Sequence, residues 1–105
     1  MRQISADAVL AFHCRRRFKR SNTVVKIVNG VPELWLFGNK IAWLCNNKLH
    51  WTMAGHPTVT TRERLNAILS GTVWQNNHTQ YYKAPGWAER IIINPNEIYV
   101  EELQS

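Results

Sequence analysis

The sequence predicts an α+β fold: a four-stranded antiparallel meander with an N-terminal helix and a short helix after the sheet, plus a C-terminal β-rich segment. Three two-residue turn signals separate apolar runs, and they are Asn29-Gly30, Gly38-Asn39 and Asn46-Asn47. A helix-capping pattern follows the last run, where Thr60 lies three residues before Glu63. The 105 residues suffice for one core and are too few for two, so we expect a single domain over residues 1–105.

The turns divide the middle of the chain into four predicted strands, at residues 23–28, 31–37, 40–45 and 48–53. If each turn holds two residues, Val24 faces Trp35 and Trp35 faces Ala42. Ala42 then faces Trp51. This register makes one face almost entirely apolar and the other apolar on the first three strands. Both faces therefore need a cover, from the helices, the C-terminal segment or a partner that includes a second copy of the chain.

A first helix is expected before the meander. Ser5 is placed to cap it, and Asp7 falls in its first turn, where the positive end of the helix dipole favours an acid. One side of this helix is apolar and is expected to pack on the sheet, and it consists of Ile4, Ala8, Ala11 and Phe12.

The second helix follows the meander. Thr60 and Glu63 form a capping box, which places the helix start near Thr61. Gly71 provides a residue that tolerates positive φ just after the end of the helix. The apolar face of this second helix consists of Leu65, Ile68 and Leu69.

The last third of the chain is expected to be rich in strands. Two strands over residues 72–75 and 79–83 are joined by a polar turn at 76–78, and the run Ile91–Ile93 forms a third. A last strand is expected around Ile98, Val100 and Leu103.

Positive charge is concentrated in the first two thirds of the chain. The formal net charge is +6, and residues 1–70 hold eleven Lys or Arg against three Asp or Glu. Residues 71–105 hold two against four. A basic field of this size attracts polyanions, so nucleic acid or an acidic protein is the expected class of partner.

Five of the basic residues lie between Arg15 and Arg20, with Phe18 among them. Such side chains neutralise phosphates and release counterions, whereas stabilising the end of a helix requires only one or two charges. The two arginines of the second helix are either additional contacts or structural ion-pair partners. The candidate nucleic-acid-binding residues are therefore Arg15, Arg16, Arg17, Lys19, Arg20, Arg62, Arg64 and Lys40.

Catalytic and metal-binding patterns are not recognisable in the sequence. Asp7, Glu33 and Glu63 are the only carboxylates of the first 70 residues, which is a poor basis for a two-metal cluster. Cys14 and Cys45 have no ligand spacing with each other or with the histidines. We therefore expect no enzyme activity, no metal and no cofactor, and no segment predicts a membrane partner.

Three segments carry a resemblance to a known family. They are FKRSNT at Phe18–Thr23, LWLFGNKIA at Leu34–Ala42 and AGHPTVTTRERLN at Ala54–Asn66. In this order they resemble small tailed-bacteriophage proteins of mostly unassigned function, over about residues 18–69. Phe37 stands where that family usually has His, and His56-Pro57 replaces the usual Trp and its neighbour. The resemblance implies a phage-encoded protein in the cytoplasm of the infected bacterium, and it implies no established reaction.

The leading hypothesis is a non-enzymatic DNA-binding protein that contacts the phosphates of double-stranded DNA with little sequence preference. The alternative is a protein-binding module that inhibits an acidic host transcription or defence factor. A third option is a single-stranded nucleic-acid binder that uses Trp43, Trp74 or Tyr81, since exposed aromatics stack on unpaired bases. A homo-oligomer built through the second sheet face is a further hypothesis.

Overall fold

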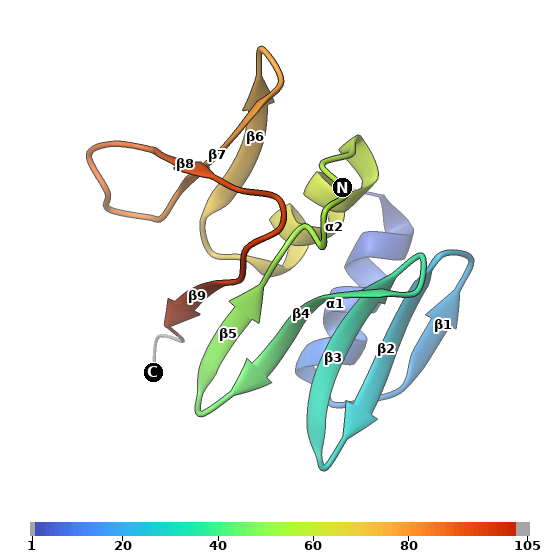
Figure 1. Cartoon of the computed structure of the whole chain (residues 1–105). Helices are drawn as coiled ribbons and strands as arrows, with labels where there is room; N and C mark the ends of the chain where they lie inside the picture. Colours follow the sequence, from blue (N-terminus) through green and yellow to red (C-terminus); the bar gives the residue numbers. More distant parts are fainter. Residues whose placement is uncertain (1, 103–105) are drawn as a thin grey trace.

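The computed structural model describes residues 2–102 (Figure 1). The chain begins with helix α1, and a run of five strands separates it from helix α2. In chain order the elements are α1 (Gln3–His13), β1 (Phe18–Arg20), β2 (Thr23–Val28), β3 (Val31–Leu36), β4 (Asn39–Cys45), β5 (Lys48–Trp51), α2 (Val59–Ile68), β6 (Thr72–Asn76), β7 (Thr79–Lys83), β8 (Ile91–Ile93) and β9 (Tyr99–Glu102).

The strands form two antiparallel sheets. The larger sheet has the order β1-β2-β3-β4-β5-β9, and the smaller has the order β6-β7-β8. The predicted α+β fold with its meander and two helices is confirmed, and both helices lie on one face of the larger sheet (Figure 1). The meander is longer than expected, because β1 extends it at one edge and β9 at the other. Leu103, which was expected in the last strand, lies outside the described residues.

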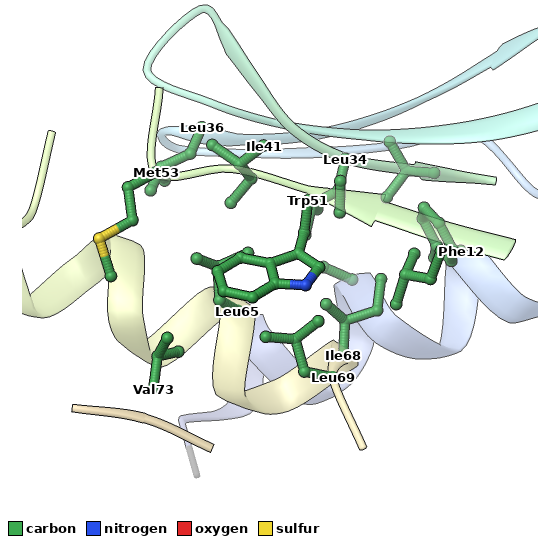
Figure 2. Close-up of a cluster of buried hydrophobic side chains, with 14 of the residues drawn as sticks. Phe12, Leu34, Leu36, Ile41, Trp51, Met53, Leu65, Ile68, Leu69 and Val73 are labelled. Carbon is green, nitrogen blue, oxygen red and sulfur yellow. The ribbon is translucent and has the colours of Figure 1, made fainter. Parts of the chain in front are cut away.

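Trp51 lies at the centre of the core, between the larger sheet and the two helices (Figure 2). Its side chain is fully buried, and its ring packs 5.0 Å from that of Tyr82 on β7 and 5.1 Å from that of Tyr99 on β9. An aromatic side chain of this size buries a large apolar area, which makes a major contribution to the free energy of folding. One apolar cluster therefore includes residues of the larger sheet, both helices and the smaller sheet.

The predicted register is right on two strand pairs and wrong on the middle one. Val24 pairs with Trp35 and Ala42 pairs with Trp51, as expected. Trp35, however, pairs with Lys40, and a β-bulge shifts the register so that Leu34 pairs with Ala42. One extra residue in a strand reverses which side chains share a face. The core face consequently combines Leu34 and Leu36 with Ala42, Leu49 and Trp51.

The second hairpin turn lies one residue earlier than expected. Phe37 and Gly38 have φ values of 49° and 79°, and Asn39 already begins β4. The sequence signal failed because Phe is unusual at positive φ, whereas glycine followed by asparagine is a favourable pair. The turns at Asn29-Gly30 and Asn46-Asn47 have positive φ at both residues and are confirmed.

Both helices start differently from the prediction. Ser5 does not cap α1; it lies buried within the helix and donates a hydrogen bond to Glu63 at 2.7 Å. Thr58, not Thr60, caps α2, by accepting a hydrogen bond from the Thr61 backbone N–H at 3.2 Å. The reciprocal bond expected from Glu63 is absent among the described residues, because that carboxylate faces α1 instead.

Gly71 serves close packing and not a positive φ. A Cβ atom built on Gly71 would lie 2.6 Å from the backbone oxygen of Lys83 and 2.6 Å from the Tyr82 ring. The residue therefore permits the chain leaving α2 to pass against β7. Its N–H donates to Glu101 on β9 at 2.8 Å, as does that of Ser70, and the Tyr82 hydroxyl donates to the same carboxylate.

Candidate nucleic-acid interface

The basic residues from Arg15 to Arg20, which we call the arginine segment, run from the end of α1 into β1. The chain turns sharply at Arg15, which has a φ of 53°, and its Nε donates to the Gly30 carbonyl at 3.2 Å. Arg16, Arg17 and Lys19 are exposed, and within residues 2–102 they form no ion pair. Three of the five predicted phosphate contacts thus point their charge to solvent.

Arg20 forms contacts within the protein. Its guanidinium lies 2.7 Å from Asp7 on α1 and 5.2 Å from the centre of the Phe18 ring. The hydrogen bond from Arg20 lowers the pKa of Asp7 below its usual range, and a second from Gln3 lowers it further. Arg20 therefore connects β1 to α1, and its charge is partly neutralised.

Arg64 is a structural residue. Its side chain is only 2% exposed, and it donates to Thr23 at 3.0 Å and to Ser5 at 2.8 Å. Its ion pair with Glu63 is 2.9 Å long. Burial lowers the pKa of this guanidinium, and the nearby Glu63 carboxylate opposes that effect. The arginine joins α2, α1 and β2, and it is enclosed by the protein.

Arg62 is also held by the fold. Its Nη1 donates to the Pro57 carbonyl at 2.9 Å, to Gln80 at 3.0 Å and to Gln75 at 3.3 Å. These contacts connect the start of α2 to the smaller sheet. Arg62 is thereby separated from the arginine segment, and it contributes to a different groove.

Asn66 completes this joint between α2 and the smaller sheet. Its amide nitrogen donates to the Val73 carbonyl at 2.9 Å, and its oxygen accepts from the Val73 N–H at 2.7 Å. The side chain thus pairs with β6 as a neighbouring strand would. The segment TRERLN at residues 61–66 therefore holds helices and sheets together. Its polar residues Arg62, Arg64 and Asn66 form hydrogen bonds within the protein.

The face of the larger sheet that no helix covers carries two rows of side chains, which we call the outer sheet face. Opposed residues in antiparallel pairs share a face, so the register identifies the members of each row. The first row is Lys19, Val24, Trp35 and Lys40. The second row is Lys26, Glu33, Trp43 and His50.

Lysines cover the tryptophans of this outer sheet face. The Nζ of Lys26 lies 3.8 Å from the centre of a Trp35 ring, and that of Lys40 lies 4.6 Å from a Trp43 ring. A cation over an indole is attracted by the ring quadrupole, and the aliphatic stem of the lysine shields the ring from water. On the outer sheet face, two lysines thus shield two tryptophan rings, Lys26 that of Trp35 and Lys40 that of Trp43.

Glu33, in the second row, contacts two residues of the first row. It accepts a hydrogen bond from the Trp35 Nε1 at 3.1 Å and lies 3.5 Å from the Lys40 Nζ. The ring of Trp43 also packs 5.7 Å from that of His50. Lys40, one of the predicted contacts, is therefore paired with Glu33 but remains on the outer sheet face. Lys26 was missed by sequence reasoning, and its only signal was a charge placed between Val25 and Ile27.

The arginine segment and the outer sheet face meet in one groove along β1 and β2. The groove has a volume of about 510 Å³, and Arg17, Lys19 and Lys26 line it together with Phe18. From Lys19 on β1 to Lys40 on β4 there are three strand spacings, or about 14 Å. That span is similar to the width of the major groove of DNA, about 12 Å.

Two other features of the described chain bear on chemistry. Within residues 2–102, no three His, Cys, Asp or Glu side chains gather closely enough to hold a metal ion. Over the same residues, neither helix has the length and apolar character needed to span a membrane.

Fold and surface together define a small α+β protein with an open, cation-rich sheet face and a joint of buried polar residues. The chain belongs to the Kyanoviridae Gp96 protein family, whose model matches residues 1–101. It is therefore a bacteriophage protein, as the resemblance implied, and the description of the family specifies no activity. No curated protein and no solved structure matches the chain.

Proposed function

We propose that this phage protein is a non-enzymatic DNA-binding protein that acts in the cytoplasm of the infected bacterium. It contacts the phosphates of double-stranded DNA and reads little of the base sequence. The contacts are Arg16, Arg17 and Lys19 of the arginine segment with Lys26 and Lys40 of the outer sheet face. Arg62 and Arg64 are not part of this set, because the fold already occupies them.

The groove along β1 and β2 is the observation that carries the proposal. Three side chains of one charge, Arg17, Lys19 and Lys26, line it and give the groove a positive potential that attracts anions. A phosphate backbone supplies such anions at a regular spacing. The sheet face beside the groove adds Lys40, so that the cations extend across four strands.

Salt dependence tests the proposal. Five cations that neutralise about five phosphates give a slope of log K against log salt of about −4 to −5. We expect this slope in an electrophoretic shift series with a duplex of arbitrary sequence. An affinity that does not change between low and moderate salt would overturn the proposal.

Charge-matched variants locate the contact. Lys26→Gln removes one proposed phosphate contact, and we expect the slope to become shallower by about 0.9. Lys48→Gln is the control, since Lys48 lies on the same sheet and pairs with Glu102 at 3.5 Å. Unchanged duplex binding by a variant with Arg16, Arg17 and Lys19 all replaced by Gln would contradict the assignment.

An acidic host protein is the second candidate partner, and the same groove favours it. Residues Val24 to Val28 line the groove while β1 pairs only with Thr23, Val24 and Val25, so the far end of β2 is a free strand edge beside cations. An extended acidic segment adds to such an edge through backbone hydrogen bonds. A host protein retained in stoichiometric amount after nuclease treatment, and lost with Lys26→Gln, would favour this partner over DNA.

A further inference from the structure

The smaller sheet carries a separate aromatic stack. Trp74 on β6 pairs with Tyr81 on β7, with ring centroids 5.7 Å apart and planes inclined by 25°. The guanidinium of Arg90 lies 4.1 Å from the centre of the Tyr81 ring. Since β7 lies between β6 and β8, Trp74 and Arg90 approach Tyr81 from opposite sides. The order across the sheet is therefore Trp74, Tyr81, Arg90.

A groove opens beside this stack, between α2 and β6. Its volume is about 500 Å³, which is within the usual range of about 300–1,000 Å³ for sites that hold small organic groups. Trp74 lines it together with apolar side chains and four polar ones, Arg62, Glu63, Asn66 and Gln75. The Glu63 carboxylate is neutralised by its ion pairs with Arg64 at 2.9 Å and Arg2 at 3.1 Å. The bonds from Arg62 to Gln75 and Gln80 hold the guanidinium in place at the groove.

Trp74 differs from the tryptophans of the outer sheet face. Lysines cover the rings of Trp35 and Trp43. Among residues 2–102, by contrast, no cation lies over the Trp74 ring, although the indole lines a groove with hydrogen-bonding groups. A planar aromatic group that enters the groove can extend the existing stack by one layer, without displacing a side chain from the indole.

The charges near this stack match a phosphate-linked ligand. Lys83 and Arg90 are the only two Lys or Arg residues among positions 71–105. Lys83 pairs with Thr72 and shares the face of Tyr81 two residues away, and Arg90 contacts the Tyr81 ring itself. The two cations of an otherwise acidic segment thus lie on the face that carries the aromatic stack.

We propose that this groove binds an unpaired nucleobase of a single-stranded nucleic acid, which stacks on Trp74. Lys83 and Arg90 contact the phosphates on its flanks as the strand crosses the smaller sheet. Aromatic platforms with neighbouring cations are the usual arrangement for binding single strands, and they tolerate any sequence because each base has a flat face. The site does not depend on the duplex contacts proposed above, because no residue belongs to both.

Fluorescence anisotropy with a labelled twelve-nucleotide oligothymidylate tests this site. We expect Trp74→Ala to weaken binding by about 5- to 150-fold, the range that loss of one stacked base produces. Trp74→Phe keeps a stacking ring in the same fold and is expected to retain most of the affinity. Trp43→Phe, on the outer sheet face, is the control for a general loss of aromatic area and is expected to bind as the wild type does.

The NMR signals of the indole N–H groups give a second measurement, which follows oligonucleotide binding by the wild-type protein itself. The Trp74 signal, assigned from its loss in Trp74→Phe, is expected to shift on titration with the oligonucleotide, while that of Trp35 stays unchanged. Equal binding by wild type and Trp74→Ala, or no shift of the Trp74 signal, would overturn the proposal. A shift produced by a proline-rich peptide, and by no oligonucleotide, would also overturn it and assign the groove to a protein partner. Duplex binding measured in parallel separates this outcome from failure of the arginine segment.

Discussion

Arginines with the same charge have opposite roles in this protein, and their surroundings decide which. Arg64 is buried and satisfied by Ser5, Thr23 and Glu63, whereas Arg16 and Arg17 are exposed and carry uncompensated charge. Nothing in the local sequence distinguishes a basic residue of the first kind from one of the second. The distinction depends on which elements pack over the side chain.

Removal of Arg64 is expected to destabilise the fold. Arg64→Ala leaves the hydroxyl of Thr23 and the carboxylate of Glu63 without their buried partner, so the free energy of unfolding should fall by about 2–4 kcal/mol. Urea unfolding followed by tryptophan fluorescence measures the change. Arg16→Ala is the control and is expected to change stability by less than about 0.5 kcal/mol. Equal stability of the two variants would show that Arg64 has no structural role.

Phe37 is strained by its turn. It has a φ of 49° and the residue is 67% exposed, so it contributes little burial in return for an unfavourable backbone conformation. Phe37→Asn is expected to raise the free energy of unfolding by about 0.5–1 kcal/mol, because Asn tolerates this conformation. Phe37→Leu has no such tolerance and is the control. A gain for Leu equal to that for Asn would assign the effect to the lost ring instead.

Helix α2 is the element on which the others depend. Its residues bond to α1 through Glu63, to β2 through Arg64 and to β6 through Asn66. Polar side chains at successive positions of a helix point in different directions, so one short helix connects three neighbours. The larger sheet and the smaller sheet are thereby held by hydrogen bonds in addition to the shared apolar cluster.

The bond between α1 and α2 through Glu63 makes the stability of the fold sensitive to acid. The Ser5 hydroxyl, which donates to Glu63 at 2.7 Å, is the main cause of its lowered pKa, and Arg2 and Arg64 add to the effect. A carboxyl whose pKa is lower in the folded state stabilises the fold above its ordinary pKa of 4.5, and that contribution is lost as the pH falls through the folded value.

We therefore expect the free energy of unfolding to fall more steeply below about pH 5 in the wild type than in Glu63→Gln. Urea unfolding over a pH series measures both slopes. Glu97→Gln, in an exposed loop, is the control and is expected to follow the wild type. Identical slopes for Glu63→Gln and the wild type would mean that the joint does not depend on the ionised carboxylate.

Four of the five tryptophans lie in three kinds of surroundings. Trp51 fills the core, Trp35 and Trp43 lie beneath lysines, and Trp74 lines an open groove. Of these four, Trp74 is the one whose indole lines a groove with no cation over its ring among residues 2–102. The basic field of the first 70 residues and the stack of the smaller sheet are therefore two independent surfaces, and the proposed variants test each without altering the other.

Sequence reasoning predicted the elements of this fold better than their faces. Local signals of two to four residues are sufficient to place a turn such as Asn46-Asn47, since its backbone preference does not depend on distant contacts. The bulge between β3 and β4 has no comparable signal, and it reverses the side chains of half the meander. The residues of the outer sheet face could therefore not be predicted from the sequence, and Lys26 was missed for the same reason.

The sequence by itself determined the α+β class, the meander with its two helices and the concentration of basic residues before position 70. These follow from local backbone preference, from the spacing of apolar residues and from composition. Only the tertiary structure decided that Arg64 is buried and that Arg62 is bonded to the smaller sheet. It also decided that lysines cover the outer tryptophans and that Trp74 lines a groove. Each of these depends on contacts between residues far apart in the chain, where packing and register outweigh local preference.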